Sequence, residues 1–368
     1  MVEDNITGSA ARIIVIGIGG AGSNAVNRMI DENTPVEYYV MNTDLQSLLG
    51  SKVPSANRII LGEEITKGLG TGGDPEIGKK SAESSIQKIH EIVRGADMVF
   101  IAAGMGGGTG TGAAPVVANA CKEEGALTLA VVTRPFGFEG KIRVNNSVAG
   151  LSALRDIVDS IIIVSNDKLL MANGTDYISK AFQESDRVLV QSVKTITNLI
   201  LMPGIINLDF ADIKNTLEHS GLALIGYGMG SGANKAIDAS NEAISSPLLE
   251  TPINGARRMI CAVTCGPSVS LYEAQECVNR IVEEAGKDVD VKFGVSINDQ
   301  LSDQIIVSVI ASDFKEEVDI TVTPNYNKPI IDKPNNTNNL ENKETSEENK
   351  EEKEEDILPD FLKNRNID

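Results

Sequence analysis

A run of glycine and threonine, Gly106-Gly107-Gly108-Thr109-Gly110-Thr111-Gly112, constrains the fold more than any other feature of the chain. It follows an apolar segment at 98–103, which predicts a buried strand, and precedes residues 113–118, which predict the start of a helix. Glycines allow positive φ angles and close approach to a ligand, and consecutive N–H groups at a helix start attract anions. We therefore favour a polyphosphate cradle here over a closely packed turn.

A second glycine motif, Gly17-x-Gly19-x-x-Gly22, follows an apolar segment at 12–16, and Asp44 comes about twenty residues later. This spacing is typical of NAD-binding dehydrogenases, which are the alternative interpretation. Two anion-binding loops that converge on one crevice fit a triphosphate better than a dinucleotide. No hydride-transfer pair is evident, since His90 lies in a predicted helix away from both loops.

Strand and helix segments alternate through the first half of the chain. The predicted strands are residues 12–16, 37–41, 59–61, 98–103, 127–133 and 160–164, and the predicted helices are residues 23–31, 81–94, 117–124 and 141–156. Such alternation predicts a parallel sheet with helices on both faces, which binds ligands at the carboxyl ends of its strands.

The second half predicts a long helix and a smaller unit. Residues 177–203 have a helical apolar pattern, which Pro203-Gly204 ends. Strands near 222–225, 259–264, 289–296 and 304–311, with helices near 234–244 and 271–285, predict a mixed sheet. The expected fold class is α/β. Its parts are a flexible N-terminus (1–11), a Rossmann-like nucleotide-binding domain (12–176), a central helix (177–203), a C-terminal α/β domain (204–323), a disordered acidic linker (324–355) and a partner-binding peptide (356–368).

The last two parts follow from composition. Asn, Lys and Glu dominate from about Pro324 through Asp356, and a segment of this kind buries too little apolar surface to fold. Apolar residues return at 357–363, beyond the linker, where they have no core to join. We interpret them as a short recognition peptide that becomes ordered on a partner.

Charge and composition exclude several classes of function. The net charge is −19, and the tail explains only part of it, so an acidic body argues against nucleic acid as a partner. No apolar run approaches the ~18 residues that span a membrane, and no signal core is evident near the N-terminus, which predicts a cytoplasmic protein without direct membrane insertion. Four cysteines without a Cys-x-x-Cys pair, and only two histidines, predict reduced thiols and no protein metal site.

The segment Gly73–Lys80 nearly matches the P-loop pattern G-x-x-x-x-G-K-[S/T]. Lys80 replaces the hydroxyl that would bind Mg²⁺, and no strand directly precedes the segment, so we treat the match as chance. The neighbouring Gly70-Thr71-Gly72-Gly73 is instead a candidate flap over a terminal phosphate, with Gly72 as its candidate contact.

Two pairs of residues four apart suit recognition of a base and a sugar. Phe182 and Asp186 fall on one face of the long helix, where the ring can stack on a purine. The carboxylate can accept from the two N–H donors of guanine, a pair that adenine lacks. Glu139 and Arg143 suit ribose hydroxyls and phosphate. The alternatives are a core aromatic beside a surface acid, and a surface ion pair.

Together these motifs resemble the FtsZ family, the tubulin-like GTPases of bacterial cell division, over nearly the whole chain. The run at 106–112 is similar to the signature loop of that family. Segments in the family's order are Gly20 to Asn24, Asn42-Thr43-Asp44, Phe136-Gly137-Phe138-Glu139-Gly140, Asn166-Asp167-Lys168-Leu169 and Asn207-Leu208-Asp209-Phe210-Ala211-Asp212. The segment 356–362 is similar to the family's tail peptide, with an inserted Leu358 and with Lys363 where arginine is usual.

The resemblance implies a tubulin-like fold that binds GTP and GDP, with Mg²⁺ held largely by water, and that hydrolyses GTP. It assigns the phosphates to Gly20, Ala21, Gly22, Ser23, Asn24 and the run at 106–112. It assigns the ribose side to Glu139 and Arg143, and the guanine to Asn166, Phe182 and Asp186.

The resemblance also implies that Asn207, Asp209 and Asp212 enter the nucleotide pocket of the next subunit, where the two carboxylates orient the attacking water. From the residues alone, Asp209 is equally well explained as the cap of a helix that begins at Ala211. A site completed by a neighbour makes hydrolysis depend on head-to-tail assembly into filaments. The implied partners are further copies of the chain and, through the tail, membrane-anchoring and regulatory division proteins at mid-cell beneath the inner membrane.

Overall fold

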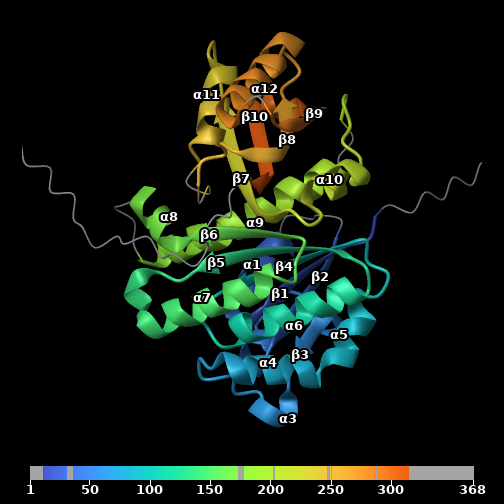
Figure 1. The fold of residues 1–368 in the computed structure, drawn as a ribbon, viewed down its shortest axis with the longest axis vertical. Coiled ribbons are helices and arrows are strands. Elements are labelled where there is room, and N and C mark those ends of the chain that lie inside the picture. Colours follow the sequence, from blue (N-terminus) through green and yellow to red (C-terminus); the bar gives the residue numbers. More distant parts are fainter. Residues whose placement is uncertain are drawn as a thin grey trace, which may run out of the picture. The chain divides into compact units, whose positions relative to one another are not determined.

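Parallel strands form the N-terminal part of the sheet (Figure 1). They are β1 (Ile13–Ile18), β2 (Glu37–Asn42), β3 (Arg58–Ile60), β4 (Met98–Gly104), β5 (Leu127–Arg134) and β6 (Ser160–Ser165). They pair in the order β3-β2-β1-β4-β5-β6, and every pair is parallel. β1, β5 and β6 are buried along their whole length, which is why their sequences are apolar without alternation.

The computed structural model describes residues 11–30, 36–172, 178–201, 204–246, 249, 251–286 and 288–314, all within one compact unit. The expected linker and tail peptide lie outside these residues. No helix in the described part is long and apolar enough to cross a membrane.

Helices follow the strands and complete a hydrophobic core on each face of the parallel sheet. The helices are α1 (Gly19–Ile30), α2 (Leu45–Leu49), α3 (Glu63–Thr66), α4 (Pro75–Ser84), α5 (Ile86–Val93), α6 (Thr109–Glu123), α7 (Lys141–Arg155) and α8 (Asn166–Ala172). Ile14 of β1 belongs to the same core as Val117 of α6. The next residue, Val15, belongs to the other core, with Val26 of α1 and Leu189 of α9 (Ile178–Leu201).

The long helix α9 leads into a second, smaller unit. Its 24 residues correspond to about 36 Å at the usual rise. Beyond it come α10 (Phe210–Leu217), β7 (Gly221–Gly230), α11 (Lys235–Ile244), β8 (Ala256–Cys265), α12 (Leu271–Ala285), β9 (Asp290–Ile297) and β10 (Ile305–Phe314). β10 pairs antiparallel with β7 and β8, while β8 and β9 are parallel, so the sheet is mixed as expected. A short pairing of β7 with β6 joins the two sheets.

Two helices begin earlier than the sequence indicates. α1 begins at Gly19 rather than at Ser23, and α6 begins at Thr109, inside the glycine run. Glycine is a poor helix former, so propensity alone places both starts later in the chain. In the folded chain, close packing of the first turns against neighbouring backbone outweighs that preference.

The helix expected at 81–94 is two helices, α4 and α5, separated at Ser85. The Ser85 hydroxyl donates to the Ser81 carbonyl and accepts from the Gly62 amide, which replaces helical hydrogen bonding at this point. α4 begins at Pro75, and the Asp74 side chain caps it by accepting from the Glu76 amide at 2.8 Å. The near-match to a P-loop is therefore a helix cap followed by the first turns of α4.

Candidate functional site

The two glycine loops lie side by side at the carboxyl edge of the parallel sheet. β1 and β4 are neighbours that end in register, with Ile18 opposite Ala103. α1 follows β1 directly, and the glycine run connects β4 to α6. A side chain on Gly19 would lie 3.0 Å from the Gly110 amide nitrogen, so the loops are in contact. The first turns of α1 and α6 thus present their backbone N–H groups at one edge.

The glycines of these loops are of two kinds. A Cβ on Gly20, Gly72 or Gly107 would meet no atom within 4 Å, so these residues border open space. A Cβ on five others would come within 3 Å of protein atoms, and these residues are Gly22, Gly106, Gly108, Gly110 and Gly112. Close packing, which we disfavoured for the whole run, therefore explains most of it. The open positions are the ones at which a ligand can approach the backbone.

The threonine hydroxyls of the run bind protein atoms. Thr109 Oγ1 lies 2.7 Å from Thr43 Oγ1, and Thr111 Oγ1 accepts from the Gly106 amide at 2.8 Å. Both threonines are buried, so they hold the shape of the loop. By contrast, the buried Ser23 Oγ in the first turn of α1 has no hydrogen-bond partner among the described residues. That hydroxyl is a candidate to meet a ligand oxygen.

The residues predicted to bind the guanine base, which include aromatic rings and an acid, lie around the start of α9. We call this region the base end of the site. Phe182 is 42% exposed, and its ring meets that of Phe136 edge-on, with centroids 5.0 Å apart. Phe136 also stacks on Phe138, at 4.9 Å. Asn166, the first residue of α8, is buried, and its Oδ1 accepts from the Ser185 hydroxyl at 2.6 Å. The structure thus brings Phe182 and Asn166 to the same end of α9, and their role toward guanine stays a prediction.

Asp186 makes an ion pair that sequence reasoning missed. Arg28 Nε donates to Asp186 Oδ2 at 3.2 Å. Burial raises the pKa of the Asp186 carboxyl, while the Arg28 guanidinium acts in the opposite direction. Arg28 lies four residues after Asn24 in α1, so it shares a helix face with the glycine loop. The spacing of four residues from Asn24 is the sequence signal that could have identified Arg28 as a neighbour of the site.

Glu139 and Arg143 pair with each other in this structure. One Glu139 carboxylate oxygen accepts from Arg143 Nη1, and the other accepts from the Phe136 amide at 2.9 Å. The Arg143 side chain is about half exposed. A Cβ on Gly106 would lie 2.8 Å from the Arg143 carbonyl oxygen, so this pair borders the glycine run. The ion pair is therefore present, and a role of these residues toward a ribose stays a prediction.

Asp209 and Asp212 cap the helix α10. Asp209 Oδ1 accepts from the Asp212 amide at 2.8 Å, and Asp212 Oδ2 accepts from the Asp209 amide at 3.4 Å. The helix begins at Phe210, one residue before Ala211, where the sequence predicts its start. Asn207 Oδ1 accepts from the Gly204 amide at 2.5 Å. Lys292 Nζ is 3.9 Å from Asp212 Oδ1, so a cation lies beside this acidic loop, residues 207–212.

The glycine loops lie at the carboxyl edge of the parallel sheet, whereas the helix that carries the acidic loop ends at its amino edge. α10 ends against the amino edge, where the hydroxyl of Ser160, the first residue of β6, donates to the Leu217 carbonyl at 2.7 Å. The glycine loops follow the carboxyl ends of β1 and β4. A six-residue strand spans about 20 Å. α9 starts beside Asn166, at the carboxyl edge, and its 24 residues extend about 36 Å before the acidic loop begins, so the chain places that loop apart from its own glycine loops.

No group of three His, Cys, Asp or Glu side chains in the described part is arranged to hold a metal ion. The described cysteines are buried and reduced, and burial raises the pKa of the Cys121 thiol to about 12. His90 contacts Glu123 and Glu124 at the end of α6, far along that helix from the glycine run.

Comparison with known proteins adds to this geometry. The model of the Tubulin/FtsZ family GTPase domain matches residues 12–174, and that of the FtsZ family C-terminal domain matches residues 221–315. An empty FtsZ dimer from M. jannaschii is similar at 38% identity and a TM-score of 0.77, over 82% of this chain and 88% of that one. The match to a GTPase domain favours a triphosphate over a dinucleotide.

More distant structures share the fold. CetZ1 from Haloferax volcanii, a GDP-bound monomer, is 22% identical with a TM-score of 0.72, over 82% of this chain and 93% of that one. CetZ2 from the same organism, a GTPγS-bound protofilament, is 21% identical with a TM-score of 0.70, over 82% and 92%.

Proposed function

We propose that this chain, which belongs to the Tubulin/FtsZ family, hydrolyses GTP at sites that are completed between adjacent copies in a filament. Membership of this family makes the chain a tubulin-like GTPase that binds GTP and GDP and self-associates. The proposal of a shared site rests on one observation. The glycine loops lie at the carboxyl edge of the parallel sheet, whereas α10, the helix that carries the acidic loop, is anchored at the amino edge.

The residues of the carboxyl edge fit a nucleotide. Open space borders Gly20, Gly72 and Gly107, and the Ser23 hydroxyl is buried without a partner among the described residues. Helix N-termini that converge there offer N–H groups to phosphates. Phe182 and Asp186 would hold the guanine, with Asn166 beside them, and Glu139 and Arg143 would lie toward the ribose. Gly22, Ala21 and Asn24, with the run at 106–112, would complete the phosphate cradle.

The acidic loop would act on the nucleotide of the next subunit. Asp209 and Asp212 would accept hydrogen bonds from the attacking water and place it in line with the γ-phosphate, and Asn207 would support them. Mg²⁺ would be held by the phosphates and by water, because the described residues offer no cluster of ligands for it. When bound, the ion neutralises charge that develops on the phosphates.

Exposed apolar side chains on both sets of loops support head-to-tail contact. Leu69 and Ile142, near the glycine loops, are 84% and 77% exposed. Ile205 is 68% exposed beside the acidic loop, and Ile297 lies nearby at the end of β9, which pairs with Ile206. Two different surfaces that meet head to tail form an open filament rather than a closed dimer.

We further propose that this filament forms the cytokinetic ring of a dividing bacterial cell. The match of residues 221–315 to the FtsZ family C-terminal domain and the 38% identity to an FtsZ support this assignment. The peptide at 356–368 would bind membrane-anchoring and regulatory division proteins. The filament would then lie in the cytoplasm at mid-cell, beneath the inner membrane.

A mixture of two inactive variants tests the shared site. Asp212→Ala keeps the pocket and loses an acid, whereas Gly107→Asp keeps the acidic loop and places a carboxylate in the phosphate cradle. Gly107 has no positive φ and open space at its Cβ position, so the second variant is expected to fold. Each variant alone should hydrolyse GTP slowly, and the mixture should recover activity. A mixture no more active than the two separate variants would contradict the proposal.

A further inference from the structure

The carboxyl end of α10 is held more completely than that of an ordinary helix. The last four carbonyl groups of any α-helix have no partner within the helix. In α10 the Lys214 carbonyl accepts from the Glu218 amide at 2.7 Å, and the Asn215 carbonyl accepts from Arg258 Nη1. The Thr216 carbonyl accepts from the Ser312 hydroxyl and the Leu217 carbonyl from the Ser160 hydroxyl, both at 2.7 Å. All four are therefore satisfied.

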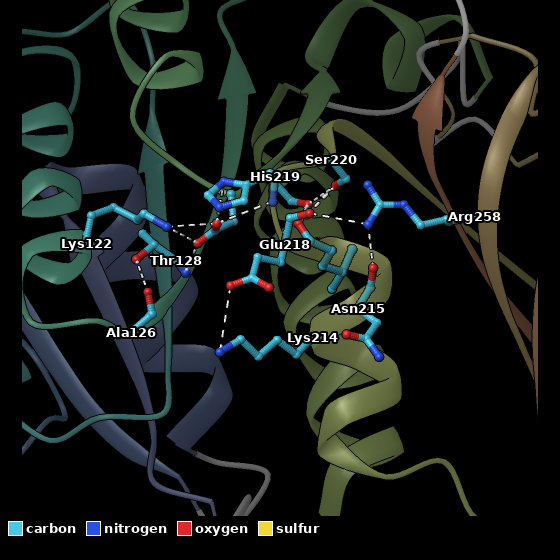
Figure 2. Close-up of polar contacts among 12 residues, drawn as sticks. Lys122, Ala126, Thr128, Lys214, Asn215, Glu218, His219, Ser220 and Arg258 are labelled. Carbon is cyan, nitrogen blue, oxygen red and sulfur yellow. Dashed lines mark hydrogen bonds and ion pairs between the residues drawn. The ribbon is translucent and has the colours of Figure 1, made fainter.

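These donors come from both sheets, and Figure 2 shows one of them, Arg258, beside Asn215 and Glu218 at the end of α10. Ser160 belongs to β6 of the parallel sheet, whereas Arg258 and Ser312 belong to β8 and β10 of the mixed sheet. Arg258 Nη1 also donates to the Glu218 carbonyl at 3.3 Å. Its Nε donates to Asp313 Oδ2 at 3.1 Å, so the guanidinium is itself held in place. We call Arg258, Ser312 and Ser160 the α10 clamp.

A buried acid, Asp159, holds the turn that follows α10 in the chain. Asp159 is 1% exposed, and its carboxylate accepts from Lys122 Nζ at 2.8 Å and from the Thr128 amide at 2.9 Å. Its main-chain carbonyl accepts from the Ser220 and Gly221 amides. His219, between α10 and these residues, has a left-handed φ of 51°, a conformation that usually requires glycine. The chain is thus held tightly on both sides of the end of α10 (Figure 2).

The other end of the same short helix carries the two acids. α10 has eight residues and is about 12 Å long. If its carboxyl end were released, a tilt of about 10° would move the first turn by about 2 Å. Misplacement of a catalytic group by about 1 Å can cost about 100-fold in rate. The direction of Asp209 and Asp212 therefore depends on what holds Asn215 to Glu218.

We propose that Arg258 is a positioning residue for GTP hydrolysis, which acts through α10 on the acids offered to the neighbouring subunit. This inference rests on the proposed shared site. The role is indirect, because the side chain of Arg258 contacts α10 and Asp313. It joins the mixed sheet to α10 and so fixes the angle at which the acidic loop meets the next pocket.

The Arg258→Gln variant tests this role. It should bind GTP with the affinity of the original chain. It should hydrolyse GTP about tenfold more slowly per assembled subunit, less than full release would cost, because Ser312 and Ser160 still hold the end of α10. Arg257→Gln is the matched control, because Arg257 is exposed on the opposite face of β8 and the substitution removes the same charge. It should keep the original rate. Arg258→Lys, which retains a donor, should recover part of the activity.

Mixing experiments separate positioning from general destabilisation. Arg258→Gln has a sound pocket and a misplaced acidic loop, so mixing with Gly107→Asp, which has a sound loop, should raise its turnover. Mixing with Asp212→Ala, whose loop is also defective, should not. If Arg258→Gln acted on its own pocket or on overall folding, Gly107→Asp would not rescue it.

Two further outcomes decide the inference. An unchanged rate for Arg258→Gln, or no rescue by Gly107→Asp while the Asp212→Ala and Gly107→Asp mixture recovers, overturns the role of Arg258 alone. Failure of that second mixture overturns the shared site itself. Should Arg258→Gln fail to fold, Asp313→Asn provides the same test, because it leaves Arg258 in place without the carboxylate that orients it. Its turnover should fall about threefold, and an unchanged rate would overturn the inference.

Discussion

The carboxyl edge of the parallel sheet is built from main chain, whereas its amino edge is held by side chains. At the carboxyl edge, glycines bring β1, β4 and the first turns of α1 and α6 together, and Gly20 and Gly107 border open space. At the amino edge, Asp159 accepts hydrogen bonds from α6 and β5, and Ser160 donates one to α10. The carboxyl edge offers the N–H groups of two helix starts to a ligand. At the amino edge, hydrogen bonds and an ion pair hold the neighbouring segments in place.

This difference fits the two halves of a shared active site. A pocket for a highly charged ligand benefits from main-chain dipoles that are already oriented and from space next to them. A loop that must reach into another molecule benefits from a rigid support, since its acids have no ligand of their own to organise them. Substitutions at the two edges should therefore affect different properties, and the following predictions test that distinction.

The largest effect is expected from Gly112→Ala. The new Cβ would lie 1.9 Å from the Pro75 carbonyl oxygen, and main chain cannot move aside as a side chain can. We expect a loss of about 3 kcal/mol or more in the free energy of unfolding, because α4 and α6 must separate. Thermal or denaturant unfolding measures this loss.

Gly107→Ala is the matched control in the same run. Its Cβ meets no atom within 4 Å, so the free energy of unfolding should change by less than about 0.5 kcal/mol, while GTP affinity should fall. Equal losses of stability in the two variants would contradict the distinction between closely packed glycines and glycines that border open space.

A smaller effect is expected at the amino edge from Lys122→Met. The substitution removes the lysine ammonium from the buried Asp159 carboxylate and leaves only the Thr128 amide and the weaker contacts of His219. We expect a loss of about 2 kcal/mol in the free energy of unfolding, below the range for a fully buried pair because Lys122 is partly exposed. Lys88→Met, at an exposed position of α5, should leave stability unchanged. Stability equal to that of the control would mean that the amino edge is not held by this pair.

The smallest effect concerns the ion pair near the base end of the site. Guanine recognition needs an ionised Asp186, and burial raises the pKa of this carboxyl. GTP affinity should therefore fall as the pH falls through that raised pKa. In Arg28→Gln the opposing effect of the guanidinium is lost, so the pKa rises further and the fall begins at a higher pH.

At neutral pH the same variant should bind GTP about tenfold more weakly, a change of ~1.4 kcal/mol. Titration with GTP over a range of pH values measures both effects. An Arg28→Gln variant with the original affinity and the original pH profile would remove Arg28 and Asp186 from guanine recognition.

Much of the fold could be predicted because it is expressed in local patterns. Apolar runs without alternation mark the strands of the parallel sheet, and the mixed sheet follows from the strand pattern after Gly221. Errors occurred where tertiary contacts override local preference. The start of α6 at Thr109 depends on close packing that propensity does not express, and the break at Ser85 depends on contacts with Ser81 and Gly62.

The site was predictable only in part. The glycine loops and the pair Phe182 and Asp186 have local spacings that carry chemical meaning. Which glycines border open space depends on neighbours such as Pro75, far away in sequence. Arg258 reaches α10 across 40 residues or more, a contact for which the sequence contains no periodic signal. Long-range polar contacts of this kind become visible only in the folded chain.

The rate of GTP hydrolysis per molecule, measured from dilute to concentrated protein, tests the central claim most directly. If each active site needs a pocket from one copy and acids from another, turnover per molecule should be close to zero when the protein is monomeric. It should then rise to a plateau over the concentrations at which light scattering reports assembly. Turnover per molecule that stays constant across that range would show that one chain contains the whole active site and would contradict the account.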